Sequence, residues 1–428
     1  MNEPATRSLL ATWPLLLGMG VLMLGAGLQG TLIGLRATLE GFPTFLIGVI
    51  MSGYYIGYVG GSLCTAPLVQ RVGHIRVFAA LTAIASVAIL LQAIFVGTTV
   101  WTVLRMASGF CFAGIYVVAE SWLNDRATNR NRGTLLAVYM VILYVGLGCG
   151  QFLLNAADPS GPLLFVLTSV LISLAVVPMT LSVQDTPEFG TVQKIGPIEL
   201  YRISPMGVVG VIAAGMLSSA LFSLGPVYAG LIGLGPADVA IFMAISILPA
   251  VLTQLPIGRL SDRVDRRSVL GTVCTLAACI AAGAAIFGAS SKWVLFILAG
   301  GYGGIVLTLY SLSLSNIHDH MEPRQMVSAS ASAILMNGTG AVAGPLVVAG
   351  LMGTFGSSAF FGSMAALLAA LSLYAFWRRQ RRAPVVGEHK VPFVGAQPQA
   401  IAGQMVAEAA QAAAEADLDH RSPHTPSE

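Results

Sequence analysis

Long apolar runs separated by short polar stretches dominate the pattern of this 428-residue chain. Each run reaches the length of about 17 to 25 residues that an α-helix needs to cross a bilayer. Lipid offers no hydrogen bonds to the backbone, so the runs are expected to form helices rather than a barrel. They predict twelve membrane spans, near residues 9–34, 44–69, 75–97, 99–123, 134–156, 162–183, 206–232, 239–258, 268–289, 292–315, 326–352 and 356–377.

Composition supports the same class of protein. Hydrophobic residues make up 56% of the chain and charged residues only 10%, whereas a soluble domain carries about 25% charged residues. A water-soluble globular protein is therefore excluded. The five cysteines fall inside apolar runs without paired spacing, and no phosphate-binding loop, nucleophile elbow or zinc signature occurs. We expect no enzyme activity, no cofactor and no metal site.

The positions of Lys and Arg predict the orientation, because short loops rich in these residues stay on the cytoplasmic side. With a cytoplasmic N-terminus, all but three of the 22 basic residues lie inside; Arg36 and Lys292 fall in outside loops and Arg105 inside a span. The chain is thus predicted to be a multi-pass protein of the cell inner membrane, in contact with the lipid bilayer, with both termini cytoplasmic. The net charge of +3 reflects this topology and does not indicate a nucleic-acid partner.

One longer polar connection divides the spans into two sets of six. It predicts an N-terminal bundle over residues 1–183, a cytoplasmic linker over 184–205 and a C-terminal bundle over 206–377. Residues 378–428 begin with an Arg-rich collar suited to lipid headgroups and continue as a tail whose Ala, Gln, Glu and Pro content predicts disorder. Two six-helix domains can move against each other within one chain, so we expect a monomer.

Internal repetition indicates that the two halves are related. Gln70-Arg71 aligns with Asp262-Arg263 at an offset of 192, and Gly146, Gly150 and Gln151 align with Gly340, Gly344 and Pro345 at an offset of 194. The matches keep the same order along both halves, as a structural repeat requires. The predicted fold is an all-α membrane protein with twelve transmembrane helices in two pseudo-symmetric six-helix bundles.

The loop after the eighth span resembles a known signature. Its sequence GRLSDRVDRRSVL, from Gly258 onward, is similar to motif A of the major facilitator superfamily, and Arg105 followed by Gly109 and Gly114 resembles the fourth-helix arginine motif of that family. The stretch RMASGFCFAGIYVVAESWLNDRATNRNRG and the later LTLYSLSLSN are most similar to its YcaD-type bacterial branch. The resemblance implies the major facilitator fold and alternating access to one solute site between the halves.

Four positions depart from the family pattern. The first copy of motif A has Gln70 where an acid is usual and Ile75 where a basic residue is usual, and in the second copy Asp265 replaces the usual glycine. Gln151 stands where the fifth-helix proline of the antiporter motif would lie. The missing proline argues against export.

Arg105 is the cation placed inside the membrane, where an arginine costs about 2.5 to 3.5 kcal/mol on the insertion scale. Either it attracts an anionic or zwitterionic solute into a central cavity, or it snorkels outward or braces helices. Further candidates for the cavity are polar and aromatic residues of the inner helices: Gln29, Tyr54, Tyr58, Tyr116, Tyr139, Gln151, Gln254, Tyr310 and Asn337.

Glu120 is the acidic residue that we place inside a span. A buried carboxyl group can hold a proton at neutral pH, which makes Glu120 the candidate for proton coupling. Its position near the cytoplasmic end also suits a structural ion pair with Arg126, Arg130 or Arg132. Both interpretations stay open.

Charges at the cytoplasmic ends of the helices predict a gate. Asp262 is expected to face Arg130 and Arg132 at the start of the fifth span, which would favour a closed interior. The full set of gate candidates is Arg71, Arg76, Arg130, Arg132, Asp262, Arg263, Arg266, Arg267 and Arg324. The eleventh span carries a candidate hinge at Gly340, Gly344 and Pro345, because a proline removes a backbone hydrogen bond and kinks a helix.

These features together predict a secondary active transporter for a small solute, a symporter or antiporter if protons are coupled. Arg105 and the missing proline favour uptake of an anionic or zwitterionic metabolite. The largely apolar inner helices leave open an efflux carrier for hydrophobic compounds, and a non-transporting membrane receptor or sensor is the alternative from another class.

Overall fold

The computed structural model describes residues 3–127, 131–181, 195–322, 325–381, 393 and 395, with side chains from Thr12 onward. Most of the predicted tail and part of the predicted linker lie outside the described residues. Every regular element in the described ranges is a helix: α1 (Glu3–Leu39), α2 (Thr44–Val72), α3 (His74–Ile94), α4 (Thr98–Asp125), α5 (Arg132–Gly150), the 3-10 helix η1 (Gln151–Ala156), α6 (Leu163–Leu174), α7 (Val176–Thr180), α8 (Pro197–Ile203), α9 (Pro205–Leu231), α10 (Pro236–Ile247), α11 (Pro249–Arg263), α12 (Arg266–Phe287), α13 (Lys292–Val306), α14 (Leu309–His318), α15 (Met326–Phe355) and α16 (Ala359–Arg381).

The twelve predicted spans are confirmed: twelve helical stretches in the described ranges are long and apolar enough to cross a membrane. Four of them are divided, into α5 and η1, α6 and α7, α10 and α11, and α13 and α14. The break between α10 and α11 falls where Pro249 begins the second piece, because proline cannot donate the backbone hydrogen bond that would continue the helix. The sequence pattern alone does not show these breaks, since the apolar runs continue through them.

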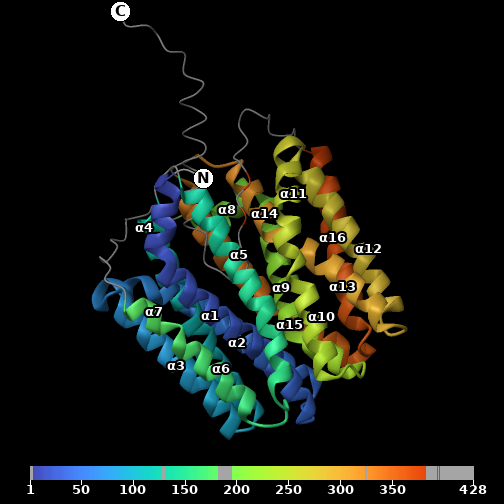
Figure 1. The fold of residues 1–428 in the computed structure, drawn as a ribbon. Coiled ribbons are helices and arrows are strands. Elements are labelled where there is room, and N and C mark those ends of the chain that lie inside the picture. The colour runs from blue at the N-terminus through green and yellow to red at the C-terminus, as the bar shows by residue number, and fades with distance from the viewer. Residues whose placement is uncertain are drawn as a thin grey trace, which may run out of the picture.

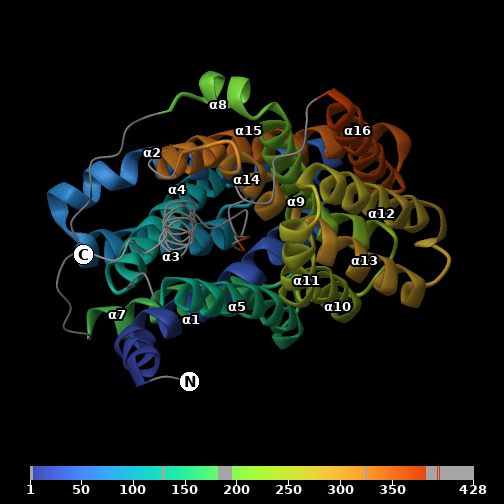
Figure 2. The same ribbon diagram turned by 90° about the horizontal axis from the view of Figure 1, so that it is seen from above.

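The spans form two bundles of six, as the seam between blue-green and yellow-red helices shows in Figure 1 and in the view from above in Figure 2. Helices α1 to α7 make the first bundle and α9 to α16 the second, with the short α8 between them in the chain. Helix α1 begins and α16 ends at the same end of the molecule (Figure 1). We call this end the terminal face and the other end the opposite face.

Close glycine contacts repeat in the two bundles and confirm the internal repeat. In the first bundle, a side chain on Gly150 of α5 would strike the carbonyl oxygen of Leu24 in α1; in the second, one on Gly344 of α15 would strike that of Met216 in α9. The glycines are 194 residues apart and their partners 192, which are the offsets found in the sequence. Small residues at these points let the helix backbones approach closely.

The two bundles pack tightly against each other near the opposite face. Gly34 of α1 lies against Ser223 and Val227 of α9, and Gly48 of α2 lies against Pro345 of α15. Towards the terminal face, helices α5 and α11 are instead separated by a cavity of about 230 Å³. The conformation is therefore closed at the opposite face and more open at the terminal face.

Candidate functional site

A polar cavity of about 50 Å³ lies between the two bundles, and we call it the central cavity. Its polar lining from the first bundle includes five residues predicted from the sequence: Gln29, Tyr54, Arg105, Tyr116 and Gln151. Phe222, Ser223 and Met243 complete the wall from the second bundle. Residues from both halves thus enclose one site, as a carrier with a shared solute site requires.

Arg105 is placed in this cavity by the close packing of α4 against α2. A side chain on Gly109 would overlap the carbonyl oxygen of Tyr54, and one on Gly57 would overlap that of Met106. This approach brings the guanidinium carbon of Arg105 to 4.5 Å from the centroid of the Tyr54 ring, a cation–π contact. Arg105 is only 5% exposed. The arginine therefore faces the interior and does not snorkel outward.

Two glutamines and a threonine add hydrogen-bonding groups to the central cavity. Thr31 of α1 donates a hydrogen bond to Oε1 of Gln151, whose Nε2 donates to the carbonyl oxygen of Leu147 at 3.0 Å. These bonds hold the Gln151 amide in one orientation. Nε2 of Gln29 and Nε of Arg105 are buried without a hydrogen-bond partner among the described residues. Both residues line the cavity.

A second, smaller cavity of about 20 Å³ shares Tyr54 and Tyr55 with the first. Its lining includes three more predicted residues, Tyr58, Tyr310 and Asn337. Asn337 is oriented by its side-chain amide, which donates to the carbonyl oxygen of Val211 at 2.9 Å. Polar groups therefore extend from the central cavity along the interface of the bundles.

Gln254 and Tyr139, the remaining predicted cavity residues, lie elsewhere. Gln254 lines the cavity between α5 and α11, and its Nε2 donates to the Oγ of Ser311 at 2.9 Å. Tyr139 of α5 lies beside Glu120, with the hydroxyl oxygen 3.5 Å from Oε1 of the carboxyl group. Neither of these two residues belongs to the lining of the central cavity.

One face of α4 carries four residues whose spacing of seven, four and four positions is close to whole helical turns: Arg105, Phe112, Tyr116 and Glu120. Beside this face, the rings of Tyr54 and Tyr58 lie 6.1 Å apart, and those of Tyr58 and Tyr116 lie 6.3 Å apart. An aromatic column thus connects the buried cation with the buried acid, which lie roughly 22 Å apart along the helix axis.

Glu120 is 5% exposed. Among the described residues its polar contact is Tyr139, and no ion pair joins it to Arg126 or Arg132. Arg130 lies outside the described residues. The structure thus places Glu120 in an aromatic environment of the first bundle.

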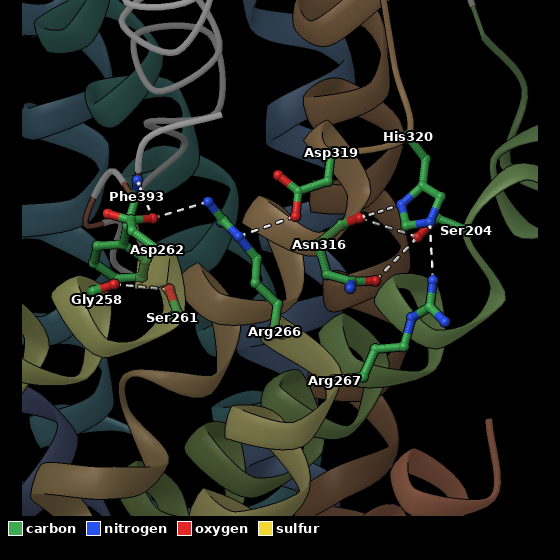
Figure 3. Close-up of polar contacts among 10 residues, drawn as sticks. All are labelled: Ser204, Gly258, Ser261, Asp262, Arg266, Arg267, Asn316, Asp319, His320 and Phe393. Atoms are coloured by element: carbon green, nitrogen blue, oxygen red, sulfur yellow. Dashed lines mark hydrogen bonds and ion pairs between the residues drawn. The ribbon is translucent and has the colours of Figure 1, made fainter. Parts of the chain in front are cut away.

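A charged network lies at the terminal face of the second bundle (Figure 3). Asp262 accepts a hydrogen bond from Arg266 at 2.9 Å, and Nε of Arg266 lies 3.0 Å from Oδ2 of Asp319, close enough for an ion pair. The Nε–H itself lacks hydrogen-bond geometry. The side chains of Arg266 and Asp319 are both only 2% exposed. Nearby, a guanidinium nitrogen of Arg267 lies 3.4 Å from Nε2 of His320. The network therefore connects α11, α12 and the end of α14.

The other gate candidates lie at the helix ends of the terminal face. Arg71, Arg76 and Arg263 are exposed at the ends of α2, α3 and α11, and Arg132 begins α5. Arg130 and Arg324 lie outside the described residues. In this conformation Asp262 is bound by Arg266 of its own bundle and by the backbone N–H of Phe393.

The candidate hinge lies within α15, which continues without a break from Met326 to Phe355. Its glycines are in close contact with α9: Gly340 against the carbonyl oxygen of Ile212, and Gly344 against that of Met216. The breaks in helical structure in the described ranges occur instead in the fifth, sixth, eighth and tenth spans.

Several contacts in these sites involve residues that sequence reasoning missed. Thr31 and Ser223 at the central cavity are single hydroxyls in apolar runs, which are common in membrane helices and carry no distinguishing signal. Asp319 lies at the end of the tenth span, and only the fold brings it to Arg266. Phe393 lies in the predicted disordered tail, yet its backbone reaches Asp262.

Comparisons with known proteins agree with this architecture. The family model of the Major Facilitator Superfamily matches residues 15–345 and 207–402. An uncharacterised MFS-type transporter of Enterobacter sp. (strain 638) is 30% identical over 355 residues, covering 82% of this chain and 90% of its own length. The uncharacterised MFS-type transporter YcaD of Salmonella arizonae is 31% identical over 323 residues, covering 74% of this chain and 83% of its own length.

Two solved structures share the fold. The nucleoside transporter NupG superposes with a TM-score of 0.70 at 14% identity, covering 86% of this chain and 98% of its own. A bacterial homologue of the human lysosomal transporter Spinster, in an inward-facing and occupied conformation, superposes with a TM-score of 0.69 at 14% identity. The match covers 91% of this chain and 99% of the homologue. With the family match over most of its length, the chain belongs to the Major Facilitator Superfamily and, like its YcaD-type relatives, is a transporter and not an enzyme.

Proposed function

We propose that this protein is a secondary active carrier that takes up a small anionic or zwitterionic solute by alternating access, with the solute held beside Arg105. It works as a monomer in the bacterial inner membrane. The terminal face is cytoplasmic. Arg378, Arg379 and Arg381 at the last turn of α16 support this orientation, because basic residues at helix ends are retained on the cytoplasmic side.

The observation that carries the proposal is the burial of Arg105 without an acidic partner. No ion pair in the described ranges includes it, and it is the charged residue of the central cavity lining. An uncompensated cation in lipid is costly, whereas a solute carboxylate or phosphate would bring the missing negative charge and accept its hydrogen bonds. The Tyr54 ring offsets part of this cost when the site is empty.

The volume of the central cavity supports a site that changes shape during transport. At about 50 Å³ it holds a few water molecules, much less than the several hundred Å³ typical of sites for small ligands. Residues of the first bundle carry the charge, and Phe222, Ser223 and Met243 cover them from the second. Movement of one bundle against the other would therefore enlarge the site and expose it to one side.

Glu120 is proposed as the group that couples transport to protons. It is buried, with Tyr139 as its polar contact, and the charged form of such a carboxyl group is unfavourable without a cation or a hydrated opening. Separation of the bundles at the terminal face would hydrate it and allow proton release. The aromatic column to Arg105 connects this group to the solute site.

A second candidate function is efflux of hydrophobic compounds. The observation in its favour is the cavity of about 230 Å³ between α5 and α11, whose lining is mostly apolar and includes Leu136, Met140 and Val251. A hydrophobic molecule could enter this cavity from the membrane. In that case solute binding would not depend on Arg105.

A binding screen followed by a flux assay tests the proposal. Purified protein is screened by thermal shift against anionic, zwitterionic, neutral and hydrophobic compounds, and each hit is then measured for flux in proteoliposomes without nucleotide. We expect anionic or zwitterionic hits that are transported. Hits restricted to neutral hydrophobic compounds would support the efflux carrier, and binding without flux would support a receptor or sensor.

A further inference from the structure

Two residues of the chain's own tail, Phe393 and Gly395, line the cavity between α5 and α11. Six residues of α5 between Gly133 and Tyr144 and three of α11 between Val251 and Leu255 form its walls, and Phe393 and Gly395 complete its lining. Phe393 and Gly395 therefore share one cavity with a helix of the first bundle and a helix of the second. This position is the opening of the bundle interface at the terminal face.

Three contacts hold the segment in place. The backbone N–H of Phe393 donates to Oδ1 of Asp262 at 3.0 Å, as Figure 3 shows. The Phe393 ring lies directly on the backbone of Gly258, where any side chain would overlap it. Gln254 lies one turn before Gly258 in α11 and is in contact with Gly395. A side chain on Gly395 would come within 2.9 Å of the Gln254 amide.

The contacts lie at successive turns of α11, from Gln254 nearest the interior, through Gly258, to Asp262 at the terminal face. Gly258 provides the flat surface that a phenyl ring needs, and Asp262 provides an acceptor for a free backbone N–H. Gln254 also binds Ser311 of α14, so the segment touches the polar interior of the second bundle. The Phe393 N–H is matched by Asp262, the Phe393 ring by Gly258 and Gly395 by Gln254. Three specific contacts of this kind distinguish the arrangement from loose packing.

A small apolar cluster separates this cavity from the central cavity. It consists of Tyr144, Leu147, Ile247, Ala250 and Leu307. Tyr144 lines the cavity that holds the tail, and Leu147 lines the central cavity. Phe393 therefore lies on the route between the central cavity and the terminal face.

We infer that Phe393 and Gly395 form an autoinhibitory wedge, which holds α5 and α11 apart at the terminal face and obstructs the route to the central cavity. The wedge opposes closure of this face because the ring occupies the space into which the two helices would move. The backbone N–H of Phe393 also binds Asp262, the residue that we expect to bind the first bundle when the terminal face closes. The consequence for transport rate rests on the proposed function; the contacts and the conformational bias do not.

A disulfide trap tests the position of the segment. In full-length protein with the five native cysteines replaced, Gln254→Cys and Gly395→Cys are combined and oxidised, and the intramolecular cross-link is quantified by mass spectrometry. Leu252→Cys with Gly395→Cys is the matched control, because Leu252 is on the same helix but 76% exposed on its outer side. We expect efficient cross-linking in the first pair and little in the second. Equal or absent cross-linking in both would overturn the inference.

Cysteine labelling at the opposite face tests the wedge without any solute. Val227→Cys reports on this face, since Val227 is fully buried where α9 meets α1. Each change removes the buried phenyl ring from the wedge, so Phe393→Ala and truncation after Arg381 are each expected to raise the labelling rate on the order of tenfold. The Gln254–Gly395 cross-link is expected to lower it. Unchanged labelling in both tail variants would contradict the wedge even if the transporter proposal is correct.

Adding the tail back as a peptide distinguishes a specific effect of its sequence from a general effect of truncation. A synthetic peptide of residues 387–399, added to the truncated Val227→Cys protein, should restore slow labelling, whereas the same peptide with Phe393→Ala should not. Equal effects of the two peptides would exclude a specific role of the ring.

Discussion

The guanidinium group of Arg105 lies over the ring of Tyr54, with 4.5 Å between the guanidinium carbon and the ring centroid. The two residues come from α4 and α2, and both belong to the first bundle. The charge of the proposed solute site is therefore fixed to one bundle, while the second bundle supplies Phe222, Ser223 and Met243 as its cover. This division lets the bundles separate without breaking the contact that orients the arginine.

Replacing the charge of Arg105 should remove solute binding. In Arg105→Gln we expect the affinity for an anionic solute to fall at least about 30-fold, because loss of one partner from a buried charge pair costs about 2 kcal/mol or more. Isothermal titration with a transported compound from the screen measures the change. Tyr54→Phe is the control: it keeps the ring under the guanidinium group and should retain affinity within about threefold. Equal losses in both variants would argue for a general packing defect.

Glu120→Gln should remove the pH dependence of transport. The amide keeps the size of the carboxyl group but cannot exchange a proton, so uptake in proteoliposomes should no longer respond to an imposed pH gradient. The wild-type protein should accumulate solute when the outside is acidic. Asp125→Asn on the same helix is the control, because Asp125 is exposed and should leave the response intact. A normal pH response in Glu120→Gln would remove this residue from the coupling role.

The contact between α2 and α4 should tolerate no side chain at Gly57. A methyl group there would overlap the carbonyl oxygen of Met106, so Gly57→Ala should destabilise the protein by about 1 to 3 kcal/mol, the usual cost of overpacking. At Gly60, one turn away, the nearest atom is 3.9 Å from the added carbon, and Gly60→Ala should be neutral. Thermal unfolding of both variants in detergent tests this difference, and similar melting temperatures would contradict the close approach of the helices.

The ion pair between Arg266 and Asp319 should be sensitive to the loss of either charge. Both side chains are 2% exposed, and removal of one partner of a buried pair costs about 3 to 5 kcal/mol. Asp319→Asn should therefore lower thermal stability strongly. Lys292 and Asp238 form a comparable pair at the opposite face with 44% and 27% of their side chains exposed, and Asp238→Asn should cost about 1 kcal/mol or less. A smaller loss for Asp319→Asn than for Asp238→Asn would show that the buried network is not structural.

Much of this architecture could be predicted from the sequence, because lipid imposes simple rules on length and polarity. The twelve spans are confirmed by helices of sufficient length and apolar character. The repeat is confirmed because Gly150 and Gly344, which align at an offset of 194, contact Leu24 and Met216, which are 192 residues apart. The breaks in the eighth and tenth spans were not predicted. Apolar composition continues through them, and only the packing around Pro249 and Leu307 reveals where each helix ends.

The candidate site was predicted in part for a similar reason. Buried polar residues such as Arg105 and Gln151 are conspicuous in apolar runs, and five of the predicted residues line one cavity. Tyr139 and Gln254 have the same composition signal but lie elsewhere, because side-chain direction depends on how each helix is rotated in the bundle. The contact between Phe393 and Asp262 joins residues 131 positions apart, and no local pattern in the tail indicates it.

Counterflow in proteoliposomes tests whether a single site at Arg105 is exposed alternately to the two sides of the membrane. Vesicles are loaded with unlabelled solute, diluted into a trace of labelled solute without nucleotide or ion gradient, and followed over time. We expect transient accumulation of label by the wild-type protein and none by Arg105→Gln. Binding of the same solute by the wild-type protein without any counterflow would contradict the carrier mechanism.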